Sequence, residues 1–372
     1  MSAAEHLLYT DDEHELRSGV RDLLTERVTL SALLGRIETA EPYDPKLWRV
    51  LTEQIGAAGL AVAEDHGGSG ATWRETAVVM EELGRSVAPT PFLGSAVLGT
   101  AALRAAHTAE ADALLPHLAG GRRSATLAVS FATVPGGQLV HGVRADGDLL
   151  TGTATSVVDA AGADVLIVPA RTPDGPVLYA LDGTQPGVER RAVVSLDLTR
   201  PLTDVVFTGA AGRVLARGEA AEAAVAGALT TGAALLASEQ LGIAEFCLES
   251  TVEYLKTRHQ FGRPIGSFQG PKHRLAALWV SITQARAVAR YAAACVADDD
   301  PDTTIAVAVA QAHCSEIAVR AAEECVQLHG GIGFTWEHHP HLYLKRAKAD
   351  ALAFGTPDRH RTILADLVDL PA

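Results

Sequence analysis

Aromatic residues are scarce in this chain of 372 residues, where phenylalanine, tryptophan and tyrosine together make up 5%. There are only two methionines, yet apolar residues as a whole reach 48%. An alanine-rich chain with few aromatic side chains favours helices over strands. The length also exceeds what a single core normally supports, so we expect two or three domains.

The chain lacks an excess of positive charge. Lysine and arginine number 31 against 45 aspartates and glutamates, which gives a net charge of -14. Binding to phosphate backbones requires clustered lysine and arginine. The composition therefore argues against a nucleic-acid partner.

Cysteines are few, and their spacing is not that of a metal site. Cys247, Cys295, Cys314 and Cys325 all fall in segments with a helical pattern. They are interpreted as small buried apolar residues of a protein in a reducing compartment, which makes the cytoplasm the expected location.

The beginning of the chain lacks the apolar run of a signal peptide, because Asp11, Asp12 and Glu13 stand where that run is needed. The apolar runs in the body of the chain are interpreted as too short or too interrupted to span a bilayer. No membrane association is expected.

Residues 1–120 have a helical pattern. Leu16, Val20, Leu23 and Leu24 are spaced to form one apolar face, with polar residues between them. A further helix is predicted over Glu75–Gly84, where the glycine ends it. We expect an N-terminal helical domain.

In residues 121–218 the period changes to that of strands. Asp146-Gly147 separates Gln138–Ala145 from Asp148–Ala154, as a hairpin turn does. Regular strand spacing without intervening helices predicts a small β-barrel or sandwich rather than a parallel nucleotide-binding sheet. The other predicted strands are Asp164–Ala170, Pro176–Leu181, Val188–Val194 and Thr203–Phe207.

Residues 219–372 are again helical and are expected to form a four-helix bundle. In the first helix, one buried stripe is predicted from Leu229, Leu236, Ile243, Cys247 and Tyr254. The predicted helices that follow run from about 272 to 297, from 301 to 329 with Asp300 as N-cap, and from about 340 to a break at Gly355 or Pro357.

Two motifs lie in this last region. Residues 258–265 read RHQFGRPI with Gln269 shortly after them, and residues 327–333 read QLHGGIG. A glycine pair alone is typical of a helix C-terminus. In this order between long helices, however, the motifs resemble the flavin-binding signature of the acyl-CoA dehydrogenase family. The resemblance covers essentially the whole chain and implies an α+β fold with an N-terminal helical domain, a small β domain and a C-terminal four-helix bundle.

The resemblance implies that FAD lies extended across a subunit contact. Arg258 would pair with the pyrophosphate through its guanidinium, Phe261 would pack on the cofactor, and Gln269 would offer its amide to the adenine end. The alternative for Arg258 is a solvated arginine at a helix end. The remaining residues implied to bind FAD are Gln327, Gly330 and Gly331, which would contact the cofactor of the neighbouring subunit, and Thr356.

The sequence departs from the family at the catalytic base. The family removes a proton α to a thioester carbonyl with a carboxylate, often the glutamate of a Glu-Gly-Thr tripeptide, while hydride passes to the flavin. Here the tripeptide is Phe354-Gly355-Thr356, and the other known position of the base falls at Gly232. Glu239, two turns beyond Gly232, is the candidate substitute, and Asp350 is a weaker one.

The β domain also departs from the family pattern. Ser130–Pro135 replaces a Thr-Glu-Pro-like loop, and Ser156–Asp159 replaces a Trp-Ile-Thr-like segment that covers the flavin. Val158 takes the place of the hydroxyl expected near flavin N5. Each FAD site is made of two halves. The half of this chain that faces its own flavin is therefore predicted to have lost its usual groups, whereas the half that contacts the FAD of the neighbouring subunit is intact.

This division resembles bacterial heteromeric acyl-CoA dehydrogenases, some of which act on steroid side-chain CoA thioesters. It implies a non-base-carrying subunit of a heterotetramer that oxidises an acyl-CoA thioester beside a related subunit with the glutamate, with electron-transfer flavoprotein as acceptor. Two alternatives remain open: a catalytically silent scaffold, and a flavin-dependent oxidase or monooxygenase on the same fold.

A metal site is not predicted. His338, His339 and His341 stand close together, but no regular element presents all three at ligand geometry, and no cysteine or carboxylate cluster joins them. The glycine-rich stretch 67–70 lacks the Lys-Ser/Thr of a phosphate-binding loop.

Overall fold

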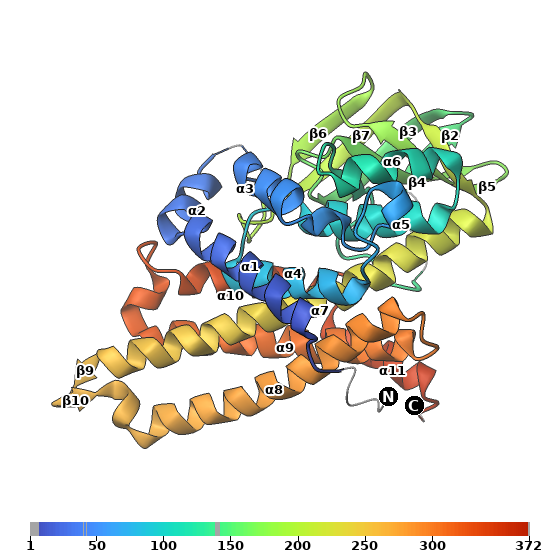
Figure 1. The fold of residues 1–372 in the computed structure, drawn as a ribbon. Coiled ribbons are helices and arrows are strands. Elements are labelled where there is room, and N and C mark those ends of the chain that lie inside the picture. The colour runs from blue at the N-terminus through green and yellow to red at the C-terminus, as the bar shows by residue number, and fades with distance from the viewer. Residues whose placement is uncertain (1–6, 40, 42, 138–141, 371–372) are drawn as a thin grey trace.

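The computed structural model describes residues 7–39, 41, 43–137 and 142–370. Figure 1 shows helices at the N-terminus, a β-sheet beside them, and long antiparallel helices that complete the chain. The expected α+β class with this order of parts is confirmed. The first four residues of the predicted strand Gln138–Ala145 lie outside the described residues.

The N-terminal part is helical throughout. Two of its helices begin with a capping box, in which Thr10 and Glu13 bond each other's backbone N–H groups, as do Thr72 and Glu75. Short 3-10 turns at Ala57–Gly59 and Glu64–His66 and π-helical segments at Val50–Gln54 and Leu93–Gly99 connect the helices. The α-helices are α1 (Asp11–Arg27), α2 (Leu30–Ile37), α3 (Pro45–Arg49), α4 (Trp73–Ser86), α5 (Thr100–Ala106) and α6 (Ala109–Ala119).

The middle part is one sheet in the order β6-β7-β3-β2-β4-β5-β8, with β1 paired to β4. Most neighbours are antiparallel, but β4 pairs in parallel with both β1 and β2. The sequence did not predict β1 and β8, which are short. The strands are β1 (Ala125–Leu127), β2 (Val143–Asp146), β3 (Leu149–Val158), β4 (Val165–Thr172), β5 (Gly175–Asp182), β6 (Val188–Ala192), β7 (Leu202–Ala211) and β8 (Arg213–Arg217).

Both faces of the sheet are buried at β4. Val165 and Ile167 belong to the core shared with the helices, whereas Leu166 and Val168 belong to a second core on the other face of the sheet. Because successive side chains of a strand point to opposite faces, a continuous apolar run is what such a strand requires.

The C-terminal part consists of helices α7 (Glu219–Thr257), α8 (Gln269–Ala297), α9 (Thr303–His329), α10 (Pro340–Asp350) and α11 (Pro357–Leu367). A small hairpin of β9 (His259–Gln260) and β10 (Arg263–Pro264) joins α7 to α8 at the tip of the pair (Figure 1). Two predicted boundaries were wrong. Helix α9 has Asp302 rather than Asp300 as its N-cap, and α10 ends at Asp350, before Gly355.

Helix α7 is the central helix of the molecule. Residues 231–245 are all buried, so the helix is covered on every side there rather than along the single stripe that was predicted. By length and composition α7 could cross a membrane, contrary to the expectation that the apolar runs are too short or too interrupted to do so. Within the fold, 67% of its apolar window is buried. This burial is that of a core helix.

Helices α4 and α7 cross at very short range because each has a glycine at the crossing. A Cβ atom on Gly242 would lie 1.9 Å from the carbonyl oxygen of Glu81, and one on Gly84 would lie 2.1 Å from the carbonyl oxygen of Glu239. Neither contact leaves room for a side chain. The two glycines therefore set the distance between the helices.

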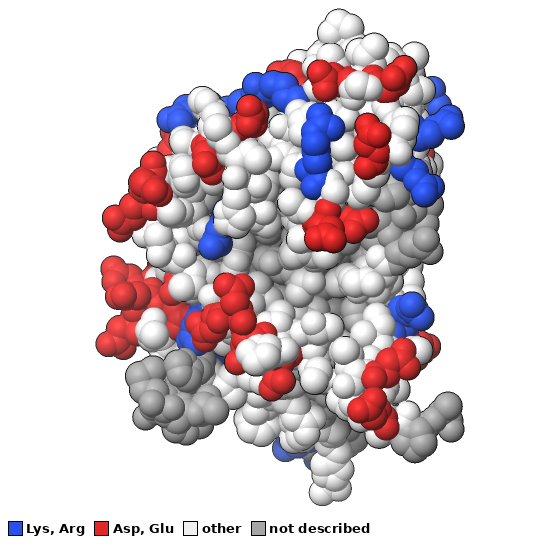
Figure 2. Space-filling view, turned by 90° about the vertical axis from the view of Figure 1, so that its right-hand side faces the viewer, with Lys and Arg blue, Asp and Glu red and all other residues white. Residues whose placement is uncertain are grey.

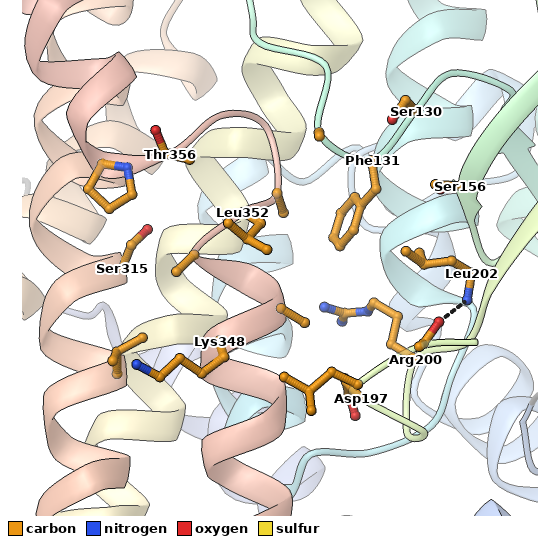
Figure 3. A pocket seen from close by; sticks show the side chains of 18 of the residues that line it. Ser130, Phe131, Ser156, Asp197, Arg200, Leu202, Ser315, Lys348, Leu352 and Thr356 are labelled. Atoms are coloured by element: carbon orange, nitrogen blue, oxygen red, sulfur yellow. Dashed lines mark hydrogen bonds between the residues drawn. The ribbon is translucent and has the colours of Figure 1, made fainter. Parts of the chain in front are cut away.

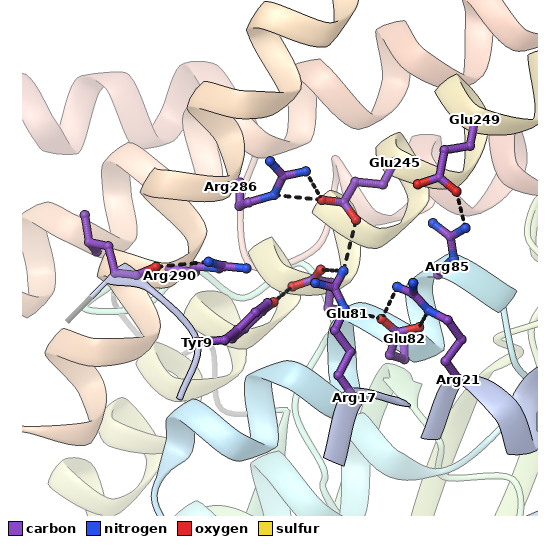
Figure 4. Close-up of polar contacts among 11 residues, drawn as sticks. Tyr9, Arg17, Arg21, Glu81, Glu82, Arg85, Glu245, Glu249, Arg286 and Arg290 are labelled. Atoms are coloured by element: carbon purple, nitrogen blue, oxygen red, sulfur yellow. Dashed lines mark hydrogen bonds and ion pairs between the residues drawn. The ribbon is translucent and has the colours of Figure 1, made fainter. Parts of the chain in front are cut away.

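Beside this crossing, a buried ionic network joins α1, α4, α7 and α8 (Figure 4). Arg17 of α1 pairs with Glu81 and Glu82 of α4 and, at 3.2 Å, with Glu245 of α7. Glu245 also binds Arg286 of α8 at 2.5 Å. Three acidic side chains thus share arginines from two further helices, which fixes how these helices pack.

The face seen in Figure 2 carries basic and acidic side chains interspersed rather than a continuous basic patch. This distribution agrees with the net charge of -14.

We predict that Gly242→Ala lowers the free energy of unfolding by about 3 kcal/mol or more, because the new methyl group would meet a backbone oxygen that cannot move alone. Gly227→Ala is the matched control on the same helix, where a Cβ meets nothing within 4 Å. The control should gain about 0.8–1 kcal/mol from helix propensity. Urea denaturation measures both. Equal effects of the two changes would contradict a close crossing.

Candidate active site and cofactor-binding residues

A cavity of about 730 Å³ lies between the sheet and the C-terminal helices (Figure 3). One wall comes from the loop after β1 and from residues 193–202 between β6 and β7, and the other comes from α9, α10 and the segment that leads to α11. Most of the lining side chains are apolar. The apolar residues that line the cavity include Phe131, Leu196, Leu202, Val319 and Leu352.

Gly232 and Phe354, which stand at the two positions expected for a catalytic base, lie against each other. A Cβ atom on Gly232 would be 2.9 Å from Cζ of Phe354 and 2.6 Å from a methyl carbon of Leu98. The Phe354 ring also meets Phe131 edge to face, with ring centroids 5.4 Å apart. Phe354 is buried, so apolar packing fills the space beside Gly232.

Phe354 is held firmly in this place. Its backbone N–H donates to the carbonyl oxygen of Phe131 at 2.7 Å, and its own carbonyl oxygen accepts from Nε2 of His360 at 2.9 Å. Its φ angle of 53° lies in the left-handed region, which costs of order 1–3 kcal/mol for a residue other than glycine. The two backbone hydrogen bonds and the ring packing offset this strain.

Glu239 lies in a buried ion-pair network rather than in the cavity. Its two carboxylate oxygens bind Arg200 at 2.6 Å and Arg346 at 2.7 Å, and its side chain is fully buried. Burial by itself raises the pKa of Glu239, but the two arginines outweigh burial and hold that pKa below its ordinary value. The side chain is therefore an anion that neutralises two arginines.

Asp350 belongs to the same network. One of its oxygens lies 3.1 Å from Arg200, while the other has no hydrogen-bond partner among the described residues. Burial, and then the negative charge of Glu239, raise the pKa of Asp350 well above its ordinary value. Asp350 does not line the cavity either, although its neighbours Ala349 and Ala351 do.

No motif in the sequence indicates this network. Asp197 and Arg200, which line the cavity, lie between two strands in a segment that carries no recognised motif. Asp197 binds Arg346, and Thr199 accepts a hydrogen bond from the same guanidinium at 2.6 Å. The only available signal was the occurrence of charged residues in a stretch between two apolar strands.

The structure separates the two β-domain residues that were expected to face the flavin. Ser156 lines the cavity, and its backbone N–H donates to Asp204 at 2.7 Å. Val158 is instead buried in the core shared with the helices, and its carbonyl oxygen accepts from the Thr126 hydroxyl at 2.8 Å. Val158 therefore does not line the cavity.

Most of the predicted cofactor residues lie far from the cavity. Arg258 follows Gly232 by roughly 39 Å along the axis of α7, at about 1.5 Å per residue. Phe261, at the hairpin tip, is 90% exposed, and Gln269 and Gln327 are exposed as well. Among the residues that the structure describes, the side chains of Arg258, Gln269 and Gln327 have no hydrogen-bond partner.

The glycine motif offers open backbone. Cβ atoms on Gly330 and Gly331 would meet nothing within 4 Å, and Gly330 has a φ angle of 68°, which favours glycine. Thr356 is separate from this group, because it lines the cavity and caps α11 by accepting from the backbone N–H of Arg359 at 3.3 Å. The predicted set therefore divides into Thr356 at the cavity and an exposed group at the other end of α7.

Two sequence models match the chain. One, described as "Acyl-CoA dehydrogenase, N-terminal domain", matches residues 10–122, and the other, described as "Acyl-CoA dehydrogenase, C-terminal domain", matches residues 222–368. The chain is 38% identical over 347 residues to the acyl-CoA dehydrogenase IpdE2 of Mycobacterium tuberculosis strain H37Rv. This alignment covers 93% of the chain and 94% of the relative.

Comparison with solved structures also finds similar proteins. The ChsE4-ChsE5 complex from Mycobacterium tuberculosis matches with a TM-score of 0.86 and 30% identity, over 98% of this chain and 100% of that chain. A variant of the Tcur3481-Tcur3483 steroid ACAD matches with a TM-score of 0.85 and 31% identity, over 96% of this chain and 98% of that chain. A glutaryl-CoA dehydrogenase from Mycobacterium smegmatis in complex with FADH2 shares the fold, with a TM-score of 0.85 and 21% identity over 100% and 97%.

We predict that Glu239→Gln lowers the free energy of unfolding by about 3–5 kcal/mol, because it leaves two buried arginines with too little negative charge. Glu253→Gln is the matched control on the exposed end of the same helix and should change stability by less than about 0.5 kcal/mol. Chemical denaturation measures both. If Glu239→Gln stays as stable as the parent and loses activity instead, Glu239 acts as a base and not as a structural anion.

Proposed function

Because the chain belongs to the acyl-CoA dehydrogenase family, an FAD-binding family of oxidoreductases, we propose that it is the non-base-carrying subunit of a heteromeric acyl-CoA dehydrogenase. The observation that carries this proposal is the packing of Phe354 over Gly232, since neither residue can accept a proton. The α C–H of a thioester is a very weak acid, and its removal requires a positioned base.

The carboxylates that do line the cavity are already paired. Asp197 is buried against Arg346. Burial raises the pKa of Asp197, but the charges of Arg346 and Arg200 and the hydrogen bonds from Thr199 and Arg346 together hold it below its ordinary value. At the mouth, Glu323 pairs with Lys348 at 2.7 Å, and its side chain is about half exposed. Glu316 is likewise half exposed and pairs with Arg361. We infer that the base comes from a related subunit with a glutamate in its Glu-Gly-Thr tripeptide.

The exposed group at the far end of α7 fits one half of an FAD site. Arg258 has no ion-pair partner among the described residues, which leaves both of its terminal nitrogens for the cofactor pyrophosphate. The open backbone at Gly330 and Gly331 allows close approach by the cofactor of a neighbouring subunit. Thr356 contributes to the site at the cavity of its own chain. Bound FAD would supply the acceptor for the hydride that leaves the β carbon.

The similar Tcur3481-Tcur3483 protein is described as a steroid ACAD. We therefore infer a large CoA thioester as substrate, electron-transfer flavoprotein as electron acceptor, and a cytoplasmic location.

The same packing at Phe354 also favours a second candidate function, that of a catalytically silent subunit kept for assembly. The two functions differ in cofactor content, because a silent subunit needs no working Arg258. An oxidase or monooxygenase on this fold would instead consume oxygen.

We predict that the purified chain alone oxidises acyl-CoA thioesters at least 10²–10⁴-fold more slowly than its complex with a glutamate-bearing dehydrogenase subunit, because loss of a general base has about that effect. Co-expression with such a subunit, followed by mass measurement, flavin quantification and a dehydrogenase assay, tests this. The expected assembly is a heterotetramer with about one FAD for every two chains. A homotetramer with one FAD per chain and full activity would overturn the proposal.

We also predict that Arg258→Ala weakens FAD binding by at least tenfold, because each lost charge-assisted hydrogen bond contributes about 1.5–3 kcal/mol. Lys256→Ala is the matched control at the same helix end, where the ammonium group pairs with Glu253 at 2.6 Å. Flavin absorbance per complex after dialysis measures both. Unchanged flavin content in Arg258→Ala would remove Arg258 from the site and favour the silent subunit.

A further inference from the structure

Three histidines meet where the end of α9, the start of α10 and the C-terminal third of α7 come together. His329 is the last residue of α9, and His338 and His339 directly precede α10. Each offers one ring nitrogen, and these three atoms lie within 4.8 Å of one another. The trio differs from the one considered in the sequence, because His329 takes the place of His341.

The hydrogen bonds of His329 leave one of its two ring nitrogens without a partner among the described residues. Its Nδ1 lies 2.7 Å from the carbonyl oxygen of Cys325. A carbonyl oxygen only accepts, so Nδ1 holds the proton and Nε2 holds a lone pair. Nε2 is buried without a hydrogen-bond partner among the described residues, on a side chain that is 3% exposed. A bond from Nδ1–H to a carbonyl with Nε2 left free is the arrangement of a metal-ligating histidine.

The other two rings are also anchored through one nitrogen. Nε2 of His339 lies 2.8 Å from the Ser250 hydroxyl of α7, which leaves Nδ1 for a ligand. Nδ1 of His338 accepts from the His339 backbone N–H at 3.0 Å, which leaves Nε2. Ligation through Nε2 of His338 would move its proton to Nδ1 and break that backbone bond.

The rings are surrounded mainly by aromatic side chains and by Cys325, whose Sγ lies 3.6 Å from Nδ1 of His329. Tyr254 stacks on His329 with ring centroids 4.4 Å apart, and Phe246 meets His339 edge to face at 5.1 Å. In the part of the chain that the structure describes, no carboxylate is hydrogen-bonded or ion-paired to any of the three rings. A donor set of neutral imidazoles suits zinc, copper or nickel rather than magnesium or calcium.

We propose that His329, His338 and His339 bind one divalent transition metal of the zinc type, with water as a fourth ligand. Zn–N bonds of about 2.0–2.1 Å place tetrahedral ligand atoms about 3.3 Å apart. The ring nitrogens lie within 4.8 Å of one another, so metal binding requires them to approach each other by at most about 1.5 Å. The metal would tie α9 to α10 across the turn Gly330–Phe334, which carries the open glycines. It is a structural site, independent of the proposed dehydrogenase function.

The test uses tag-free, chelator-treated protein and two probes, Zn²⁺ and Co²⁺. We expect one Zn²⁺ per chain by metal analysis, a submicromolar dissociation constant in competition with a chromophoric chelator, and the intense visible bands of four-coordinate Co²⁺. His329→Gln and His338→Gln should each weaken binding at least tenfold. His313→Gln is the matched control, because His313 also lies on α9 with a buried, unpartnered Nε2 but outside the trio.

Absence of binding would overturn the proposal. Equal binding by all variants would mean an adventitious ion only, and an equal loss in His313→Gln would place the metal elsewhere. Should His329→Gln lose its fold by circular dichroism, His338→Gln decides, because His338 is only partly buried and lies outside the helices. As a second readout, Zn²⁺ should raise the melting temperature of the parent chain and not that of His338→Gln.

Discussion

The close crossing of α4 and α7 is the constraint on which the rest of the structure depends. With Gly84 on one helix and Gly242 on the other, each backbone approaches a carbonyl oxygen of its partner at a distance that no side chain would allow. The crossing fixes the axis of α7, a helix of 39 residues. One half of that helix carries Gly232, against which Phe354 packs, and the other half projects to Arg258 and the β9–β10 hairpin that follows it (Figure 1).

Two buried ionic networks lie on either side of this crossing. One centres on Glu81 and Glu245 and brings in α1 and α8; the other centres on Glu239 and Arg346 and brings in α10 and the segment between β6 and β7. Burying ions is expensive, and a well-packed apolar replacement is often as stable. In this protein the networks join residues of several helices and of the segment between β6 and β7, and so they favour one arrangement of these elements.

The cavity and the exposed end of α7 differ in the groups that they present. The cavity has apolar packing at Phe354 where the family places a base, whereas the far end has Arg258 and open glycine backbone without partners among the described residues. This arrangement is in keeping with the proposal that a second, related subunit completes the sites.

The sequence by itself determined the family, the fold class and the cofactor motifs, because these depend on local features: the change from helical to strand period, the order of the two motifs, and glycine where φ is positive. It left barrel and sandwich undecided and missed the short strand β1, because pairing between distant strands is not encoded in local spacing. Only the tertiary structure decided which groups became neighbours. It packed Phe354 against Gly232, buried Glu239 between two arginines, and brought His329 to His338 and His339. The exposure and charge state of a side chain depend on partners far away in the chain, and a one-dimensional pattern does not contain them.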